Sequence, residues 1–299
     1  MNVIEVEGLT KRYGRDRGVE GLTFDVHRGE SFGFLGPNGA GKTTTIRTLL
    51  DLIRPTSGAV RVFGSDPHRQ GVSVRRRIGY LPGELALYER MTGEELVRSF
   101  ADLRGGTAAI HGRIAQLVER LGVDLARKVG ELSHGNKQKL GLLLAFMHDP
   151  DLLILDEPTQ GLDPLVQQTF YAMVEEEQRR GATIFLSSHV MPEVERLCDR
   201  VGIIREGHLA TVADIGELKT KALRRVEFHF DAPVPPSVFE RLPGVKDVAT
   251  HGDSIVLSVE GELDEVVKEA ARHHVVSLET RAPNLEEAFL AFFEAERSA

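Results

Sequence analysis

The stretch that most constrains the fold runs from Gly36 to Thr44 and reads Gly-Pro-Asn-Gly-Ala-Gly-Lys-Thr-Thr. It matches the whole phosphate-binding loop pattern G-x-x-x-x-G-K-S/T. Its glycines let backbone N–H groups turn toward one anion, Lys42 can reach the outer phosphates of a nucleotide, and Thr43 can ligate Mg²⁺. The pattern therefore predicts a nucleoside triphosphate site. The expected nucleotide contacts are Gly36, Pro37, Asn38, Gly39, Ala40, Gly41, Lys42, Thr43 and Thr44.

The residues on either side of this loop place it between a strand and a helix. Residues 31–35 form a short apolar run, as a buried strand requires, and Ile46, Leu49, Leu50 and Ile53 recur afterwards at helical spacing. Backbone donors and the helix dipole both favour phosphate at such a junction. A glycine-rich turn that only happens to contain Lys-Thr would not require this context.

A second apolar run, residues 152–155, ends in the carboxylates Asp156 and Glu157. A continuous apolar strand is typical of a parallel sheet that is covered on both faces, and its carboxyl end lies at the ligand-binding edge. We therefore expect Asp156 to hold the Mg²⁺ shell and Glu157 to orient or deprotonate the attacking water. Lys42 completes the expected catalytic set. The alternative is a surface Asp-Glu pair that only ends a strand.

His189 follows the next predicted strand, residues 183–186. A histidine after a strand is more often structural than catalytic. Its place on the strand after the carboxylate strand favours a catalytic role here, because the carboxyl ends of both strands face the same crevice.

Composition limits the class of protein. A chain of 299 residues with 41% hydrophobic content is typical of a folded protein with one large and one smaller domain. The longest uncharged apolar run, residues 140–147, is far shorter than the ~20 residues that span a bilayer, and the N-terminus lacks a secretory signal pattern. The single cysteine, Cys198, suits a reducing cytosol. A net charge of -8 argues against nucleic acid as the main partner.

Periodicity predicts how the rest of the chain is organised. Residues 3–7 and 22–26 alternate as half-exposed antiparallel strands do, and Tyr13 between them is either a loop aromatic or a residue that stacks on a nucleotide base. From about residue 88 to 148 the pattern is helical, which predicts a helical insertion. After about residue 216, strand and helix candidates follow the order β-α-β-β-α-β of a small ferredoxin-like domain. An amphipathic helix is expected from Asn284.

With the phosphate loop, the segment 132–136 and the carboxylate strand in this order, the chain resembles the ATP-binding subunit of ABC transporters. The resemblance covers roughly residues 3–211. It implies that Tyr13 stacks on adenine and that His189 is the family's switch histidine. It also implies that Ser133 and Gly135 belong to the signature that closes over the γ-phosphate of a second subunit. The tail is similar to the C-terminal extension of bacterial exporter ATPases for drugs, lipids or polysaccharides.

The sequence departs from the family pattern in two places. In the signature, usually Leu-Ser-Gly-Gly-Gln, His134 replaces a glycine and Asn136 replaces the glutamine, while Ser133 can still cap the helix. The glutamine expected after residues 79–82 is Gly83, followed by Glu84. We expect the Glu84 carboxylate to supply the missing oxygen ligand for Mg²⁺. The alternative is a solvated loop charge, with water in the missing position.

Together these features predict an α/β fold. Residues 1–215 are expected to form a mostly parallel sheet of the P-loop NTPase type with an antiparallel β subdomain and a helical insertion, and residues 216–299 an α+β, ferredoxin-like accessory domain. We expect an ATP hydrolase that pairs with a second copy or a close relative around two ATP molecules and Mg²⁺. It would drive a separate transmembrane permease that exports a drug, lipid or other small molecule, from the cytoplasmic face of the cell membrane. The alternative is a soluble ATPase of this type that acts on ribosomes or DNA.

Overall fold

The computed structural model describes residues 1–14, 16–221 and 223–281. The chain forms two compact units, Met1–Val212 and Ala213–Ala299. The sequence predicts a boundary at residue 215, and the structure places it within β9 (His208–Asp214). The helix expected from Asn284 lies outside the described residues.

The first unit is built on a six-stranded sheet in the order β5-β6-β7-β3-β8-β9. Its other strands are β3 (Ser31–Leu35), β5 (Ile78–Leu81), β6 (Leu152–Asp156), β7 (Thr183–Ser188) and β8 (Arg200–Arg205). Neighbouring strands from β5 to β8 are parallel. Because β3, β6 and β7 are buried along their whole length, the apolar residues of each strand form a continuous run and do not alternate with polar ones. The predicted mostly parallel sheet is confirmed.

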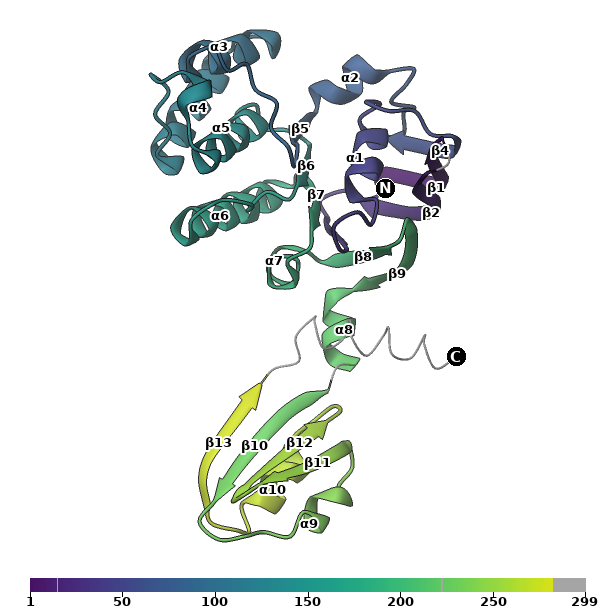
Figure 1. The fold of residues 1–299 in the computed structure, drawn as a ribbon, viewed down its shortest axis with the longest axis vertical. Helices are drawn as coiled ribbons and strands as arrows, with labels where there is room; N and C mark the ends of the chain where they lie inside the picture. The colour runs from purple at the N-terminus through teal and green to yellow at the C-terminus, as the bar shows by residue number, and fades with distance from the viewer. Residues whose placement is uncertain (15, 222, 282–299) are drawn as a thin grey trace. The chain divides into compact units, whose positions relative to one another are not determined.

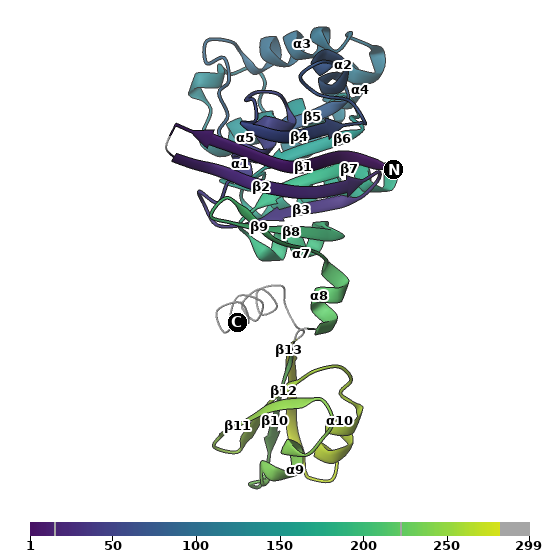
Figure 2. The same ribbon diagram turned by 90° about the vertical axis from the view of Figure 1, so that its right-hand side faces the viewer.

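A second, antiparallel sheet lies over one face of the first (Figure 2). It contains β1 (Asn2–Tyr13), β2 (Asp16–His27) and β4 (Ser57–Val62), in the order β2-β1-β4. Phe24 of β2 stacks on Phe32 of β3 with ring centroids 5.6 Å apart, and Phe34 and Phe185 lie within 5.5 and 6.2 Å of Phe24. This aromatic cluster joins the two sheets in one core and anchors the strand that precedes the phosphate loop.

The helical insertion is also confirmed. It contains α3 (Gly93–Leu103), α4 (Ala108–Leu121), a short 3-10 turn (Val129–Glu131) and α5 (His134–Phe146), and Figure 1 shows these helices gathered together. Thr92 and Glu95 form the capping box that starts α3. The other helices of this unit are α1 (Lys42–Leu49), α2 (Gly71–Arg76), α6 (Pro164–Arg180) and α7 (Met191–Leu197). Within the described ranges, no helix has both the length and the apolar character needed to cross a membrane.

The second unit has the predicted β-α-β-β-α-β order. After α8 (Ile215–Lys221) follow β10 (Arg224–Phe230), α9 (Ser237–Glu240), β11 (Val245–His251), β12 (Ser254–Val259), α10 (Asp264–Ala270) and β13 (Val275–Arg281). The strands pair antiparallel in the order β11-β12-β10-β13, which is the ferredoxin-like arrangement. Phe228 and Phe230 alternate inward from β10 and pack with Phe239 of α9, so this unit has its own core.

Candidate active site

The phosphate loop connects β3 to α1 at the carboxyl edge of the parallel sheet. Two of its glycines are required by the backbone. Gly41, which precedes α1, has a φ of 111°, a conformation that residues with a side chain rarely adopt. A Cβ at Gly36 would lie 2.3 Å from the backbone oxygen of Ile204 on β8. The loop is therefore tight because β8 packs directly against it.

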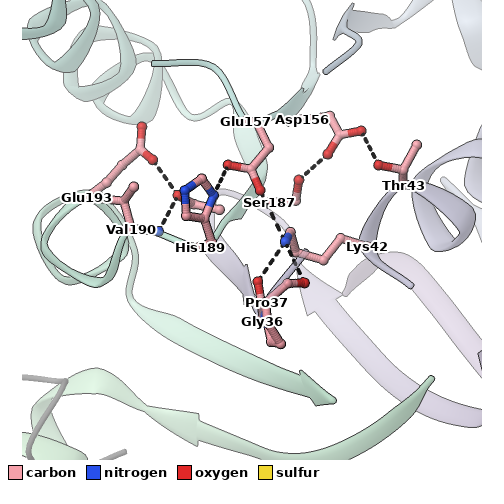
Figure 3. A network of polar contacts seen from close by, with 11 residues as sticks. Gly36, Pro37, Lys42, Thr43, Asp156, Glu157, Ser187, His189, Val190 and Glu193 are labelled. Carbon is pink, nitrogen blue, oxygen red and sulfur yellow. Dashed lines mark hydrogen bonds and ion pairs between the residues drawn. The ribbon is translucent and has the colours of Figure 1, made fainter. Parts of the chain in front are cut away.

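Lys42 begins α1 and points into the loop. Its side chain is only 6% exposed, and Nζ donates to the carbonyl oxygens of Gly36 (2.6 Å) and Pro37 (3.2 Å). Nζ also lies 3.1 Å from Glu157 Oε1. That contact is an ion pair without hydrogen-bond geometry, since Glu157 Oε1 is buried with no hydrogen-bond partner. The ammonium group is thus held at the bottom of the loop, beside a carboxylate (Figure 3).

Thr43 and Asp156 place two oxygen atoms side by side. Thr43 Oγ1 donates to Asp156 Oδ2 over 2.8 Å, and the Ser187 hydroxyl donates to Asp156 Oδ1. Asp156 is fully buried at the end of β6. A hydroxyl next to a carboxylate is the donor set that Mg²⁺ prefers, and this ion usually takes its remaining ligands from phosphate and water. These residues therefore fit a Mg²⁺ that is bound together with a nucleotide.

Glu157 follows β6 in a left-handed conformation, with a φ of 50°. A residue with a Cβ is held there at a cost of about 1–3 kcal/mol, so the surrounding structure must impose it. The backbone N–H donates to Ser187 O over 3.0 Å, and Oε2 lies 2.7 Å from Nδ1 of His189. Because a carboxylate only accepts hydrogen bonds, the Nδ1 of His189 carries the proton. Glu157 thus lies between Lys42 and His189 (Figure 3).

Tyr13 borders the same hollow as the phosphate loop. The hollow measures about 240 Å³ and is lined by Tyr13, Gly18, Asn38, Gly39, Gly41, Lys42, Thr43, Thr44 and Glu157. The Tyr13 side chain is half-exposed, and Lys11 Nζ lies 5.3 Å from its ring centroid. The aromatic ring can stack on a base and the loop can bind phosphates, so the lining suits both parts of a nucleotide.

The signature residues lie elsewhere in the chain. Ser133 caps α5, its hydroxyl accepting from Asn136 N over 3.3 Å, and neither it nor Gly135 lines the hollow that contains Lys42. A Cβ at Gly135 would lie 2.8 Å from Gly161 O. The amino end of α5 therefore packs on the loop that follows Glu157. Any contact of this signature with a nucleotide requires a nucleotide other than the one in this hollow.

Gly83 lies against the buried carboxylate. A Cβ at this position would be 3.3 Å from Asp156 Oδ2, so a side chain in place of this glycine would stand directly over that oxygen. Glu84 is exposed and forms no hydrogen bond or ion pair within the part of the chain that the structure describes. Its expected role as a Mg²⁺ ligand stays a prediction.

Two features of the site were not among the sequence predictions. Ser187 fixes the Asp156 carboxylate, and Gly18 packs closely on the strand that carries Tyr13, since a Cβ there would lie 2.6 Å from Lys11 O and 3.0 Å from Tyr13 Cε2. Ser187 could have been found from its position at the end of an apolar strand, two residues before His189, where parallel strands present polar groups to a ligand. Gly18 carries no comparable local signal.

Known proteins resemble this chain over most of its length. The family model described as ABC transporter matches residues 19–160. The bacitracin transport ATP-binding protein BcrA of Bacillus licheniformis is 37% identical over 281 residues, which cover 89% of this chain and 90% of that protein. The chain belongs to the ABC transporter family.

Other ABC proteins agree with this assignment. The linearmycin resistance ATP-binding protein LnrL of Bacillus subtilis (strain 168) is 33% identical over 305 residues, which cover 96% of this chain and 97% of that protein. A solved ATP-binding subunit of an ABC transporter matches with a TM-score of 0.69 and 33% identity, covering 73% of this chain and 92% of its own. A dimeric ATP-binding cassette bound to ADP and Pi shares the fold, with a TM-score of 0.64 at 19% identity. As an ABC ATP-binding subunit, the chain is an ATP hydrolase.

Proposed function

We propose that this chain is the motor subunit of a bacterial exporter for a drug-like or lipid-like small molecule. The observation that carries the proposal is the polar network of Lys42, Glu157 and His189 beside the Thr43–Asp156 pair at one edge of the sheet. Relatives named for bacitracin transport and linearmycin resistance favour export of such compounds. The cargo itself would be selected by a separate permease, with this chain bound to its cytoplasmic side.

Two chains are proposed to enclose two ATP molecules. In each site Tyr13 stacks on adenine, and the backbone of residues 36–44 with Lys42 binds the phosphates. Ser133 and Gly135 of the other copy close over the γ-phosphate. Support comes from the position of this signature at an exposed end of α5, outside its own chain's hollow. Because only ATP carries the γ-phosphate, ATP binding would close the pair and hydrolysis would release it.

In our proposal Mg²⁺ would be held by Thr43 and Asp156, with Glu84 as the third protein ligand. When bound, the ion would neutralise charge on the phosphates. Glu157 would accept a proton from the attacking water, since it lines the hollow and its Oε1 forms no hydrogen bond within the described residues. His189 would hold the other oxygen of that carboxylate in place. In this division of roles, Thr43 of α1 and Asp156 of β6 hold the ion. Glu157 and His189, which follow β6 and β7, act on the water.

The membrane subunit is proposed to contact the segment that follows β5. An apolar hollow of about 300 Å³ lies there, lined by Leu50, Leu52, Arg75, Ile78, Tyr80, Pro82, Leu85, Ala86, Leu87, Phe100, Arg104, Gly141 and Leu144. An amphipathic helix can place apolar side chains in such a groove. Pro82 and Leu85 flank Gly83 and Glu84, so a helix bound here would act on the segment that lies against Asp156.

Co-purification tests the proposal as a whole. The chain, isolated from its own cells in mild detergent, should bring with it a protein with several membrane-spanning helices and bound cargo. Recovery with ribosomes or DNA, and no membrane protein, would favour the soluble alternative instead.

A Glu84 substitution tests the proposed third ligand. Glu84→Ala should lower the hydrolysis rate and its stimulation by the permease roughly tenfold while changing ATP affinity little, since the proposed ligand contacts the ion and not the nucleotide. Glu84→Gln should be milder because it keeps one oxygen ligand. Steady-state ATPase rates at several Mg²⁺ concentrations measure both, with Glu119→Ala on the exposed face of α4 as a control. If the hydrolysis rate of Glu84→Ala depends on Mg²⁺ as that of the unchanged protein does, Glu84 is not a ligand of the ion.

Truncation tests the division of the chain. The second unit has its own core, and the described residues that line the hollow around Lys42 all belong to the first unit. A protein that ends after Lys219 should therefore bind ATP with an affinity within about threefold of the full chain. Binding of a fluorescent ATP analogue measures this, with circular dichroism as the folding control. A folded truncation that does not bind ATP would show that the assignment of two separate units is wrong.

A further inference from the structure

Glu193 is a buried carboxylate behind the histidine loop. It lies on α7, only 1% exposed, and its Oε2 accepts a hydrogen bond of 2.6 Å from the Ser188 hydroxyl. That hydroxyl in turn accepts from the backbone N–H of Val190 over 3.0 Å. Ser188 and Val190 are the two neighbours of His189, so the chain of hydrogen bonds fixes the backbone on both sides of the imidazole (Figure 3).

The same segment is tied to the phosphate loop. The Ser188 carbonyl accepts from the backbone N–H of Gly36 over 3.3 Å. His189 itself is about half-exposed, and its one hydrogen bond to another side chain in the described residues is the 2.7 Å contact with Glu157. The imidazole therefore takes its position from the backbone of its loop and not from packing around the ring.

A buried carboxylate at this place carries a cost that an apolar residue would avoid. Oε1 of Glu193 has no hydrogen-bond partner among the described residues. Burial raises the pKa of Glu193 to about 7, against the hydroxyls of Ser188 and Thr159, which both lower it. An aliphatic side chain of similar size would fill the same space without this penalty. The carboxylate must therefore be explained by what its hydrogen bond does.

We propose that Glu193 and Ser188 are positioning residues that hold the His189 imidazole against Glu157 through the backbone of residues 188–190. This inference rests on the role proposed above for His189 and Glu157. Without the Ser188 hydroxyl, Val190 N–H and Glu193 Oε2 both lose their partners, and the loop can relax. Small shifts of a group that orients a catalytic base reduce turnover without changing how substrate binds.

The test removes the Ser188 hydroxyl in two backgrounds, one with His189 present and one with His189 replaced by alanine. Ser188→Ala should lower the ATPase kcat about tenfold and leave KM for ATP within about twofold. In a His189→Ala protein the same substitution should change kcat less than about twofold, because its effect acts through the imidazole. Thr183→Val is the matched control. It deletes another buried hydroxyl of β7, at the far end of the strand, where Thr183 Oγ1 accepts from Gly29 N, and should leave kcat unchanged.

A second pair of variants keeps the test decisive if Ser188→Ala does not fold. Glu193→Gln keeps an oxygen that accepts from Ser188 and should retain kcat within about threefold, whereas Glu193→Leu removes the acceptor and should lower kcat about tenfold. Equal losses from Ser188→Ala with and without His189, or equal kcat in Glu193→Gln and Glu193→Leu, would overturn the inference. A His189→Ala protein with full activity would instead refute the proposed role of the histidine, and the positioning role with it.

Discussion

Replacing Glu157 by glutamine is expected to stop hydrolysis and to accumulate an ATP-bound dimer. The amide keeps the size of the carboxylate and an oxygen that can accept from His189, so the left-handed turn and the hollow should persist. It cannot accept a proton, and loss of a general base costs about 10²–10⁴-fold in rate. The substitution also removes the negative charge that lies 3.1 Å from Lys42 Nζ. The ammonium group then attracts phosphate without competition from that carboxylate.

Size-exclusion chromatography with and without Mg-ATP, together with a steady-state ATPase assay, measures this result. Glu206→Gln is the matched control, since Glu206 is also a left-handed glutamate, with a φ of 50°, but lies in the turn between β8 and β9 and outside the hollow. It should hydrolyse ATP and remain in exchange between monomer and dimer. A Glu157→Gln protein that is monomeric in Mg-ATP even with the permease present would contradict the proposed closure.

The sequence predicts those parts of the site whose structure is determined by residues that are close together in the chain. The phosphate loop is contiguous because successive backbone N–H groups bind one anion, so residues 36–44 identify it alone. The strand that ends in Asp156 is apolar throughout because it is covered on both faces. In the second unit, the period-two alternation of Val226, Phe228 and Phe230 predicts β10 because those side chains alone face its core.

The remaining features depend on contacts between distant segments. Ser187 meets Asp156 only because β6 and β7 pair in parallel with Asp156 opposite Ser187, a register that no local pattern specifies. The contact of Gly83 with Asp156 likewise depends on the pairing of β5 with β6. Glu193 looks like an ordinary helix residue in the sequence, since a carboxylate is normally exposed there. Its burial follows from the packing of α7 beside β3 and β7.

Replacing Lys42 by alanine is expected to lower ATP affinity at least about 100-fold. Among the described residues that line the hollow, Lys42 alone carries a positive charge, and its side chain is 6% exposed. A charge held in such a site interacts more strongly with phosphate than one in bulk water, because few water molecules screen it. Alanine also leaves Glu157 without its cation, so the hollow becomes negative where we propose that the γ-phosphate lies.

Isothermal titration with ATP measures the loss, and Lys11→Ala is the matched control. Lys11 lies near the Tyr13 ring and does not line the hollow, so its removal should change affinity less than about threefold.

The Glu157 charge can be separated from the loss of the Lys42 ammonium group in a double variant. If part of the affinity loss in Lys42→Ala arises from the unopposed Glu157 charge, then adding Glu157→Gln should restore some affinity, because the repulsion of phosphate disappears while the missing ammonium group does not return. No recovery in the double variant would mean that the direct contact of Lys42 with phosphate accounts for the whole effect. Equal losses in Lys11→Ala and Lys42→Ala would show that binding depends on general positive charge near the site and not on the ammonium group inside the loop.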